Sequence, residues 1–142
     1  MDAKAPRYFL DSNIWIYALA DNQEASKHSI ARQLIVPESV VVSTQVVNEV
    51  CTNLIRKSEF KEDQIRSLVQ AFYEGFDVVS FSLDIINSAS NLRERYALSF
   101  WDSLIVSSAL SSQTDILYSE DMQDDLIVAE RLRIVNPFKS VP

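Results

Sequence analysis

Short apolar runs alternate with stretches of helical periodicity along this chain, and that alternation constrains the fold more than any other feature. Five runs have the length and composition of β-strands: Arg7–Asp11, Val40–Ser43, Asp77–Ser80, Asp115–Tyr118 and Leu132–Asn136. The first, second and fourth are almost wholly apolar, which is typical of strands buried on both faces of a sheet. The alternation predicts an α/β fold with a parallel sheet covered by helices on both faces.

The segments between these runs carry the signals of amphipathic helices. Val46, Val50 and Leu54 repeat at four residues, which predicts a helix that ends near Lys57. A second helix is expected over Lys61–Glu74, and others follow residues suited to cap a helix N-terminus. The predicted N-caps are Ser43, Ser82 and Ser99, the last with capping-box spacing to Asp102.

Length and composition suit one globular domain over residues 1–142, with 47% hydrophobic residues. No apolar run approaches the roughly 20 residues that a membrane span needs, so no membrane partner is expected. The N-terminus has no apolar stretch after a basic patch, as a secretory signal would. Cys51 has no second cysteine to pair with. We therefore expect a cytoplasmic protein.

The scarce residues exclude several kinds of chemistry. A single glycine rules out a glycine-rich phosphate loop or a dinucleotide fingerprint. One histidine and one cysteine cannot build the usual tetrahedral zinc site, and His28, in a polar stretch, is a poor member of a catalytic triad. The net charge of -7 argues against a nucleic-acid partner, unless some acids hold cations that cancel their charge.

Four acids stand where they could meet at one edge of the predicted sheet. Asp11 and Asp121 follow the first and fourth strands, and Glu49 lies outside the apolar stripe of its helix. Asp102 falls in the first turn of its helix. Each has an ordinary structural alternative: a helix cap for Asp11, a solvated helix face for Glu49, a capping box for Asp102 and an acid-rich turn for Asp121.

Taken together, the four acids point to a metal site. Sites in parallel sheets form outside the carboxyl ends of the strands, near the point where the strand order reverses. Carboxylates brought together there repel one another and raise one another's pKa. A hard cation with oxygen ligands relieves this repulsion, and without histidine or cysteine nearby Mg²⁺ or Mn²⁺ is favoured over zinc.

In these residues the chain resembles the PIN-domain ribonucleases, and most closely the VapC-type toxins of bacterial toxin–antitoxin pairs. The resemblance covers nearly the whole chain and depends on the order and spacing of several short motifs. These are DSN at Asp11–Asn13, STQVVNE at Ser43–Glu49, LSFWDSLIVSSAL at Leu98–Leu110, LYSEDMQD at Leu117–Asp124 and IVNPF at Ile134–Phe138.

The resemblance implies a fold, a site and partners. It implies a three-layer α/β/α fold with a four- or five-stranded parallel sheet, a homodimer, and cleavage of RNA with Mg²⁺ or Mn²⁺. It also implies a cognate antitoxin whose tail occupies the active-site groove. The metal-binding and catalytic acids would be Asp11, Glu49, Asp102 and Asp121, supported by Asn13 and Ser119. The chain departs from the pattern at Asp125, where close relatives often have glycine.

Several basic residues could contact RNA, and three other functions are alternatives to a ribonuclease. The candidates for contacts with the RNA backbone are Arg56, Lys57, Arg93 and Arg95, whereas Trp15 and Trp101 are expected in the core. A receiver-type signalling domain also combines a parallel sheet with Mg²⁺, but its acid pair and its lysine have no clear counterparts here. A haloacid-dehalogenase-type phosphatase would need Asp-x-Asp where this chain has Asp-Ser-Asn. A PIN-like module that binds RNA or a partner without cutting remains an alternative.

Overall fold

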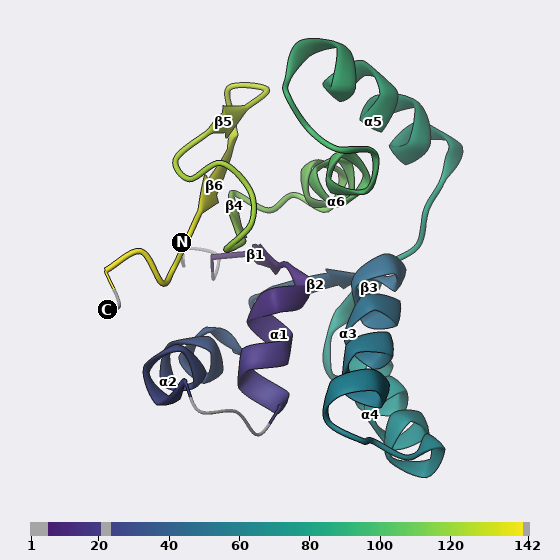
Figure 1. Ribbon diagram of the computed structural model, residues 1–142. Coiled ribbons are helices and arrows are strands. Elements are labelled where there is room, and N and C mark those ends of the chain that lie inside the picture. Colours follow the sequence, from purple (N-terminus) through teal and green to yellow (C-terminus); the bar gives the residue numbers. More distant parts are fainter. Residues whose placement is uncertain (1–5, 21–23, 141–142) are drawn as a thin grey trace, which may run out of the picture.

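A central sheet with the strand order β3-β2-β1-β4-β6-β5 organises the fold (Figure 1). The computed structural model describes residues 6–20 and 24–140. The strands are β1 (Tyr8–Leu10), β2 (Val40–Ser43), β3 (Asp77–Val79), β4 (Ile116–Tyr118), β5 (Ile127–Val128) and β6 (Leu132–Val135). All neighbouring strands pair in parallel except β5, which pairs antiparallel with β6. The predicted α/β class and the parallel sheet are confirmed.

The sheet has one strand more than the four or five expected. The additional strand, β5, has two residues and forms a hairpin with β6. Ala129 and Glu130, at the turn of that hairpin, have φ angles of 52° and 58°. Such turns usually carry asparagine or glycine, so the sequence gives no hairpin signal at this point.

Helices cover both faces of the sheet, which gives three layers. Figure 1 shows the helices of the first half of the chain on one side of the sheet and the remaining helices on the other. The first group is α1 (Ser12–Leu19), α2 (Ala25–Leu34), α3 (Thr44–Lys57) and α4 (Glu62–Gly75), and the second is α5 (Leu83–Arg95) and α6 (Phe100–Ser111). None of the helices in the described ranges is long and apolar enough to cross a bilayer.

The three predicted serine caps are confirmed. The Ser43 hydroxyl accepts a hydrogen bond from the amide of Val46 at 3.3 Å, and that of Ser82 accepts from Ile85 at 3.2 Å. Ser99 accepts from the amide of Asp102 at 3.1 Å. Each bond satisfies an N–H group that the first turn of a helix cannot pair internally, so each helix begins at a fixed residue.

Helix α6 is buried along most of its length, as its small and apolar residues predict. Ser107 is 1% exposed, and its hydroxyl donates to the carbonyl of Ile85 in α5 at 2.7 Å. Ser103 accepts a hydrogen bond from the Arg93 side chain of α5, also at 2.7 Å. Small side chains let the two helices pack closely, and these polar contacts fix their relative position. Asp102 therefore stands on a rigid element.

Candidate functional site

The ends of β1 and β4 place two predicted site residues side by side. Leu10 and Tyr118 are partners in the parallel register, so Asp11 and Ser119 follow at the same level. The amide of Asp11 donates to the carbonyl of Tyr118 at 3.0 Å. The Ser119 hydroxyl donates to Oδ2 of Asp11 at 2.7 Å, and both side chains are buried.

Asp11 is both a helix cap and a member of the acid site. Its Oδ1 accepts a hydrogen bond from the amide of Ser12 at 2.7 Å, which caps α1. Burial raises its pKa to about 6, with smaller contributions from the charges of Asp102 and Asp121, against hydrogen bonds from Ser119 and Ser12. The cap explanation is therefore confirmed without removing Asp11 from the site.

Asn13 and Ser119 hold the loop after β4 against the start of α1. The Asn13 amide nitrogen donates to Oδ2 of Asp121 at 3.1 Å, and its oxygen accepts from the amide of Glu120 at 3.3 Å. The Ser119 oxygen accepts from the amides of Asp121 and Met122 at 3.3 and 3.4 Å. Both residues therefore link the loop after β4 to the start of α1, beside Asp11 and Asp121.

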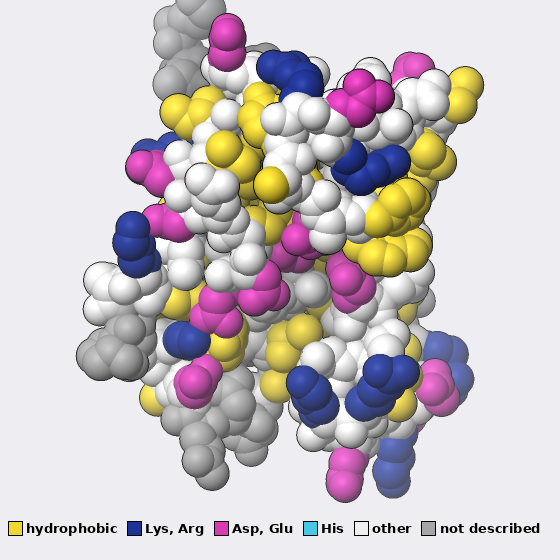
Figure 2. All heavy atoms as spheres, turned by 45° about the horizontal axis from the view of Figure 1, so that its top comes forward, with side chains coloured by type: hydrophobic (Ala, Val, Ile, Leu, Met, Phe, Trp, Pro, Cys, Tyr) yellow, Lys and Arg dark blue, Asp and Glu magenta, His cyan; other side chains and the backbone are white. Residues whose placement is uncertain are grey.

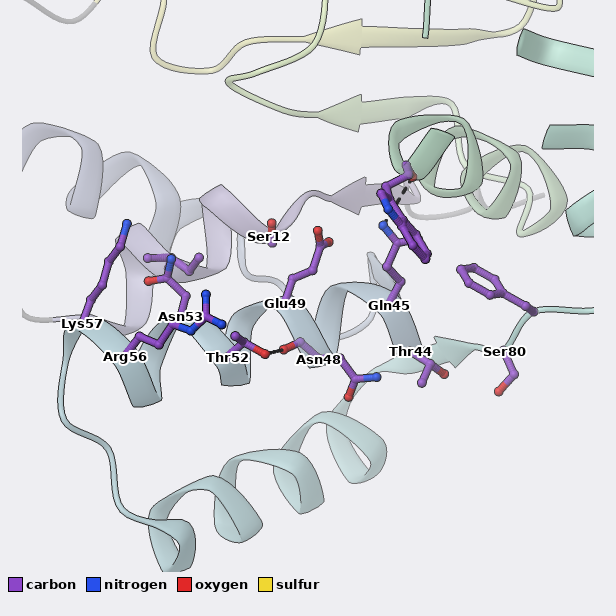
Figure 3. Close-up of a pocket in the computed structure, with 13 residues that line it drawn as sticks. Ser12, Thr44, Gln45, Asn48, Glu49, Thr52, Asn53, Arg56, Lys57 and Ser80 are labelled. Carbon is purple, nitrogen blue, oxygen red and sulfur yellow. Dashed lines mark hydrogen bonds between the residues drawn. The ribbon is translucent and has the colours of Figure 1, made fainter. Parts of the chain in front are cut away.

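Glu49 lies on α3 and lines a groove of about 870 Å³ (Figure 3). In Figure 3 its side chain rises from the helix toward Ser12 at the start of α1. Although solvent reaches Glu49, the surrounding protein limits its hydration, and its pKa rises to about 7. Burial contributes most to this shift and the charge of Asp11 comes next, while a hydrogen bond from Gln45 opposes it.

Asp102 is half-buried in the first turn of α6, where Ser99 caps the helix. Burial raises its pKa, a hydrogen bond with Ser99 lowers it, and the charge of Asp121 raises it further. The capping interpretation and the site interpretation are again compatible, because the carboxylate also faces the other acids.

The four predicted acids come from four elements and interact through their charges. Asp11 and Asp102 each act with Asp121 and with Glu49, so they form the centre of the group, which we call the acid cluster. Figure 2 shows acidic side chains gathered near the middle of one face. Within residues 6–20 and 24–140, no lysine or arginine is among the groups that shift the pKa of Asp11, Glu49 or Asp102.

The acid cluster fits a hard divalent cation bound partly through water. In the described part of the chain, no three Asp, Glu, His or Cys side chains stand close enough to hold one ion directly. Mg²⁺ usually keeps several water ligands and takes only one or two carboxylates from the protein. An all-oxygen group of acids with uncompensated charge matches that preference, so the residues present fit Mg²⁺ or Mn²⁺.

Of the four candidate RNA-contacting residues, only Arg56 and Lys57 line the groove beside Glu49. Arg56 and Lys57 line it and are exposed, whereas Arg93 packs over the Phe100 ring with its Cζ 4.5 Å from the ring centroid. Trp15 is buried, as predicted, but Trp101 is 59% exposed and lines the groove. The core prediction for Trp101 is wrong because α6 is apolar on several faces, so its periodicity does not indicate which side is buried.

A polar contact that no sequence pattern predicts lies behind the loop that carries Asp121. Lys27 on α2 lies 2.6 Å from Glu120, and its Nζ also donates to the Tyr17 hydroxyl at 3.2 Å. Tyr17 in turn donates to Glu120 at 2.9 Å, and its ring packs edge-on against Phe138. We call Tyr17, Lys27, Glu120 and Phe138 the loop support. No local pattern links residues so distant in the chain.

A profile of the PIN domain matches residues 8–137. The chain belongs to the PIN-domain family. PIN-domain proteins are typically nucleases, and PIN nucleases generally use divalent metals. A comparison with curated protein sequences finds no match.

Several solved structures share this PIN fold at low sequence identity. A toxin–antitoxin complex from Klebsiella pneumoniae has 20% identity and a TM-score of 0.69, over 92% of this chain and 97% of that one. VapC20 of Mycobacterium tuberculosis, a Sarcin-Ricin loop cleaving toxin, has 18% identity and a TM-score of 0.64, over 78% of this chain and 86% of that one. FitAB bound to a DNA fragment has 14% identity and a TM-score of 0.67, over 92% and 95%.

The backbone at Asp125 and the ion pair of Lys139 bear on two questions that the sequence of this PIN domain raises. Asp125 has a φ of 69°, a conformation that glycine adopts without strain and that aspartate tolerates better than most residues. Its side chain accepts a hydrogen bond from Arg133 at 2.6 Å. Lys139 pairs with Asp124 at 3.0 Å, so the lysine after the last strand is engaged outside the acid cluster, unlike that of a receiver domain.

Proposed function

We propose that this PIN domain is a Mg²⁺- or Mn²⁺-dependent ribonuclease that hydrolyses RNA phosphodiester bonds. The observation that supports this most directly is the acid cluster, in which three acids have raised pKa values and no cationic side chain is among the groups that shift them in the described ranges. Such a cluster costs stability unless it serves a cation. A structural role would be served as well by neutral side chains.

The four acids of the cluster have different proposed roles in cation binding and water activation, according to their positions. A bound divalent cation would polarise the phosphoryl oxygen and lower the pKa of an attacking water. We assign Asp11 and Asp102, at the centre, to holding the cation. Glu49 and Asp121, whose charges each act with both of these acids, are the candidates for orienting the water. Asn13 and Ser119 would keep Asp121 and Asp11 in place through the hydrogen bonds described above.

The substrate phosphates need positive charge beside the acids. Arg56 and Lys57 line the groove next to Glu49 and form no ion pair within the described ranges. We therefore infer that these two residues contact the RNA backbone. Arg93 is engaged with Ser103 and Phe100 and is a structural residue instead.

We further infer that the chain is the toxin of a toxin–antitoxin pair, with a cognate antitoxin and a homodimeric state. Support comes from structural neighbours that are themselves toxin–antitoxin complexes. Exposed apolar residues on α5, Leu83 at 73% and Ile86 at 48%, offer surface that a partner would cover. The single free cysteine, Cys51, agrees with a reducing cytoplasmic location.

The test is cleavage of an end-labelled RNA by the purified protein in chelator, in Mg²⁺ and in Mn²⁺. We expect cleavage only with metal, and loss of cleavage in Asp102→Asn with the fold retained. Asparagine keeps the shape of Asp102 but removes the charge that holds the cation. Cleavage by Asp102→Asn at the wild-type rate would mean that Asp102 serves only the helix N-terminus and does not bind the cation.

The same assay tests the non-catalytic alternative. Metal-independent RNA binding without any product, across RNAs that contain both loops and duplexes, would favour a PIN-like binding module. A matched control is Asp84→Asn, which neutralises an acid in the first turn of α5 and should leave cleavage unchanged.

A further inference from the structure

The two tryptophans of the chain occupy opposite environments. Trp15 is 2% exposed and packs edge-on against Phe72 and Phe76, with ring centroids 4.8 and 5.1 Å apart. Trp101 is 59% exposed, and its ring meets only one other aromatic ring in the described ranges, that of Phe100, at 5.2 Å. An aromatic ring this large gains little from standing in water, which raises the question of what it contacts.

Trp101 stands at one end of the groove and directly beside the acid cluster. It precedes Asp102 in the chain, and it lines the groove together with Phe81 and Gln45. Gln45 Nε2 donates to the carbonyl of Trp101 at 3.3 Å, which fastens this turn of α6 to α3. Gln45 also hydrogen-bonds Glu49. The backbone that carries the ring is therefore held at a set place relative to Glu49 and Asp102.

Basic residues lie toward the other end of the same groove. Figure 3 shows Arg56 and Lys57 on α3 beyond Glu49, on the side away from Gln45. Arg56 follows Gln45 by eleven positions of the helix, which corresponds to roughly 16 Å along the axis. The groove thus presents an aromatic ring, then the Glu49 carboxylate, then two cations.

We propose that Trp101 is a base-stacking residue that holds an unpaired RNA base beside the cleavage site. The proposal rests on the ribonuclease function proposed above. Bases stack on aromatic side chains whatever their sequence. In duplex RNA the base faces are already stacked on their neighbours, and they cannot reach the ring.

Gln45 gives the same end of the groove a second feature suited to a base. Its side chain is 9% exposed, and its Oε1 has no hydrogen-bond partner within the described ranges. Buried oxygens of this kind normally have a donor. The oxygen is itself buried, so an N–H of a base stacked on Trp101 can pair with it only if the Gln45 side chain turns toward the groove.

Phe100 provides a matched control for Trp101. It is the preceding residue, is 53% exposed, and belongs to the same helix turn. Its ring lies against the guanidinium of Arg93, and it does not line the groove. If exposed aromatic surface in general promoted RNA binding, Phe100→Ala and Trp101→Ala would have similar effects.

The experiment measures binding separately from cleavage. We place Trp101→Ala, Trp101→Phe and Phe100→Ala in the Asp102→Asn background and titrate each, in Mg²⁺, into a fluorescein-labelled RNA oligomer. The oligomer is used single-stranded and annealed to its complement. We expect Trp101→Ala to weaken single-strand binding about tenfold, Trp101→Phe to restore most of it, and duplex binding to change little in any variant.

Tryptophan fluorescence gives a second readout that leaves Trp101 in place. The single strand should quench the emission of Asp102→Asn and the duplex should not, because buried Trp15 cannot be reached. Equal losses for Trp101→Ala and Phe100→Ala, no loss for Trp101→Ala, or equal quenching by both RNA forms would each overturn the proposal. Cleavage in the separate assay would then still support the ribonuclease function.

Discussion

The Ser119 hydroxyl donates a hydrogen bond of 2.7 Å to Oδ2 of Asp11, across 108 positions of the chain. This bond joins the ends of two neighbouring strands, and the Ser119 oxygen also accepts from the amides of Asp121 and Met122. One buried hydroxyl therefore favours the charged form of Asp11, against the effect of burial, and holds the loop that carries Asp121.

Ser119→Ala should raise the pKa of Asp11 further, because the hydroxyl favours the charged carboxylate. Metal binding requires that carboxylate to be charged, so the pH at which binding is half-maximal should move upward. The measurement is the Mg²⁺ affinity as a function of pH, by calorimetry. The matched control is Ser107→Ala, which removes another buried 2.7 Å hydroxyl bond away from the acids. Equal pH profiles for both variants would argue against this role.

The metal-free protein should lose stability as the pH rises from about 4 to about 7. Folding raises the pKa of Asp11 from 3.8 to about 6 and that of Glu49 from 4.5 to about 7. Over this window the folded state binds more protons than the unfolded state, so the free energy of unfolding falls with pH. The pKa of Asp124 is lowered, so its protonation changes the stability only below this pH range.

Thermal melts in chelator across this pH range test that sign. The wild type should melt at a higher temperature near the acidic end, and Glu49→Gln should flatten the dependence because it removes one of the acids whose pKa is raised. A wild-type melting temperature that rises steadily toward neutral pH would show that the acid cluster costs the fold nothing.

Lys27→Met should weaken metal binding although Lys27 is outside the acid cluster. The loop support holds Glu120, the residue before Asp121, through contacts of 2.6 Å from Lys27 and 2.9 Å from Tyr17. Without the ammonium group, the Glu120 carboxylate loses its ion-pair partner and the loop loses its fixed position. Mg²⁺ affinity, measured by the shift in melting temperature, should fall more than the stability of the metal-free protein.

Lys139→Met is the matched control for that prediction. Lys139 pairs with Asp124 at 3.0 Å and is 75% exposed, and exposed ion pairs contribute little. We expect Lys139→Met to change neither metal affinity nor stability appreciably. If Lys27→Met behaved in the same way, the loop would be positioned by Asn13 and Ser119 alone.

Local signals in the sequence were sufficient to predict the buried strands, the starts of three helices, and the proximity of Asp11 and Asp121. Apolar runs identify strands because buried parallel strands have no polar face, and serine caps mark the helix starts at Ser43, Ser82 and Ser99. Since parallel strands end at one edge, the meeting of Asp11 and Asp121 follows from the fold class.

The features that could not be predicted from the sequence depend on tertiary contacts. Helix α2 was not predicted because only Ala31 in it is buried, so it has no apolar stripe. The exposure of Trp101 depends on which side of α6 meets α5. The contact between Lys27 and Glu120 spans 93 positions, and no short-range pattern records it.

Expression of the wild-type chain without an antitoxin should slow cell growth if the toxin assignment holds. The reason is the proposed cleavage of cellular RNA, so Asp102→Asn at a matched protein level should be harmless. Growth curves and the mapping of RNA ends shortly after induction are the measurements. Wild-type protein that accumulates without effect would count against the toxin assignment and leave the nuclease chemistry to the assay in vitro.

Asp11→Asn should raise the melting temperature of the metal-free protein and abolish most of its response to Mg²⁺. The substitution removes a buried charge that faces Asp102 and Asp121, while asparagine caps a helix about as well as aspartate. Part of the gain is offset because the amide has one acceptor oxygen where the carboxylate uses two, toward Ser12 and Ser119. We therefore expect a modest rise in the metal-free state.

The response to metal carries the larger difference. Mg²⁺ at a hundredfold excess over its Kd should stabilise the wild type by roughly 2.7 kcal/mol, a shift on the order of 5–10 °C for a chain of this size. Asp11→Asn should shift much less, because it has lost a ligand. Melts of both proteins in chelator and in Mg²⁺, at constant ionic strength, give the comparison. Equal shifts, with no gain in the metal-free variant, would mean that the ends of β1 and β4 do not share a metal site.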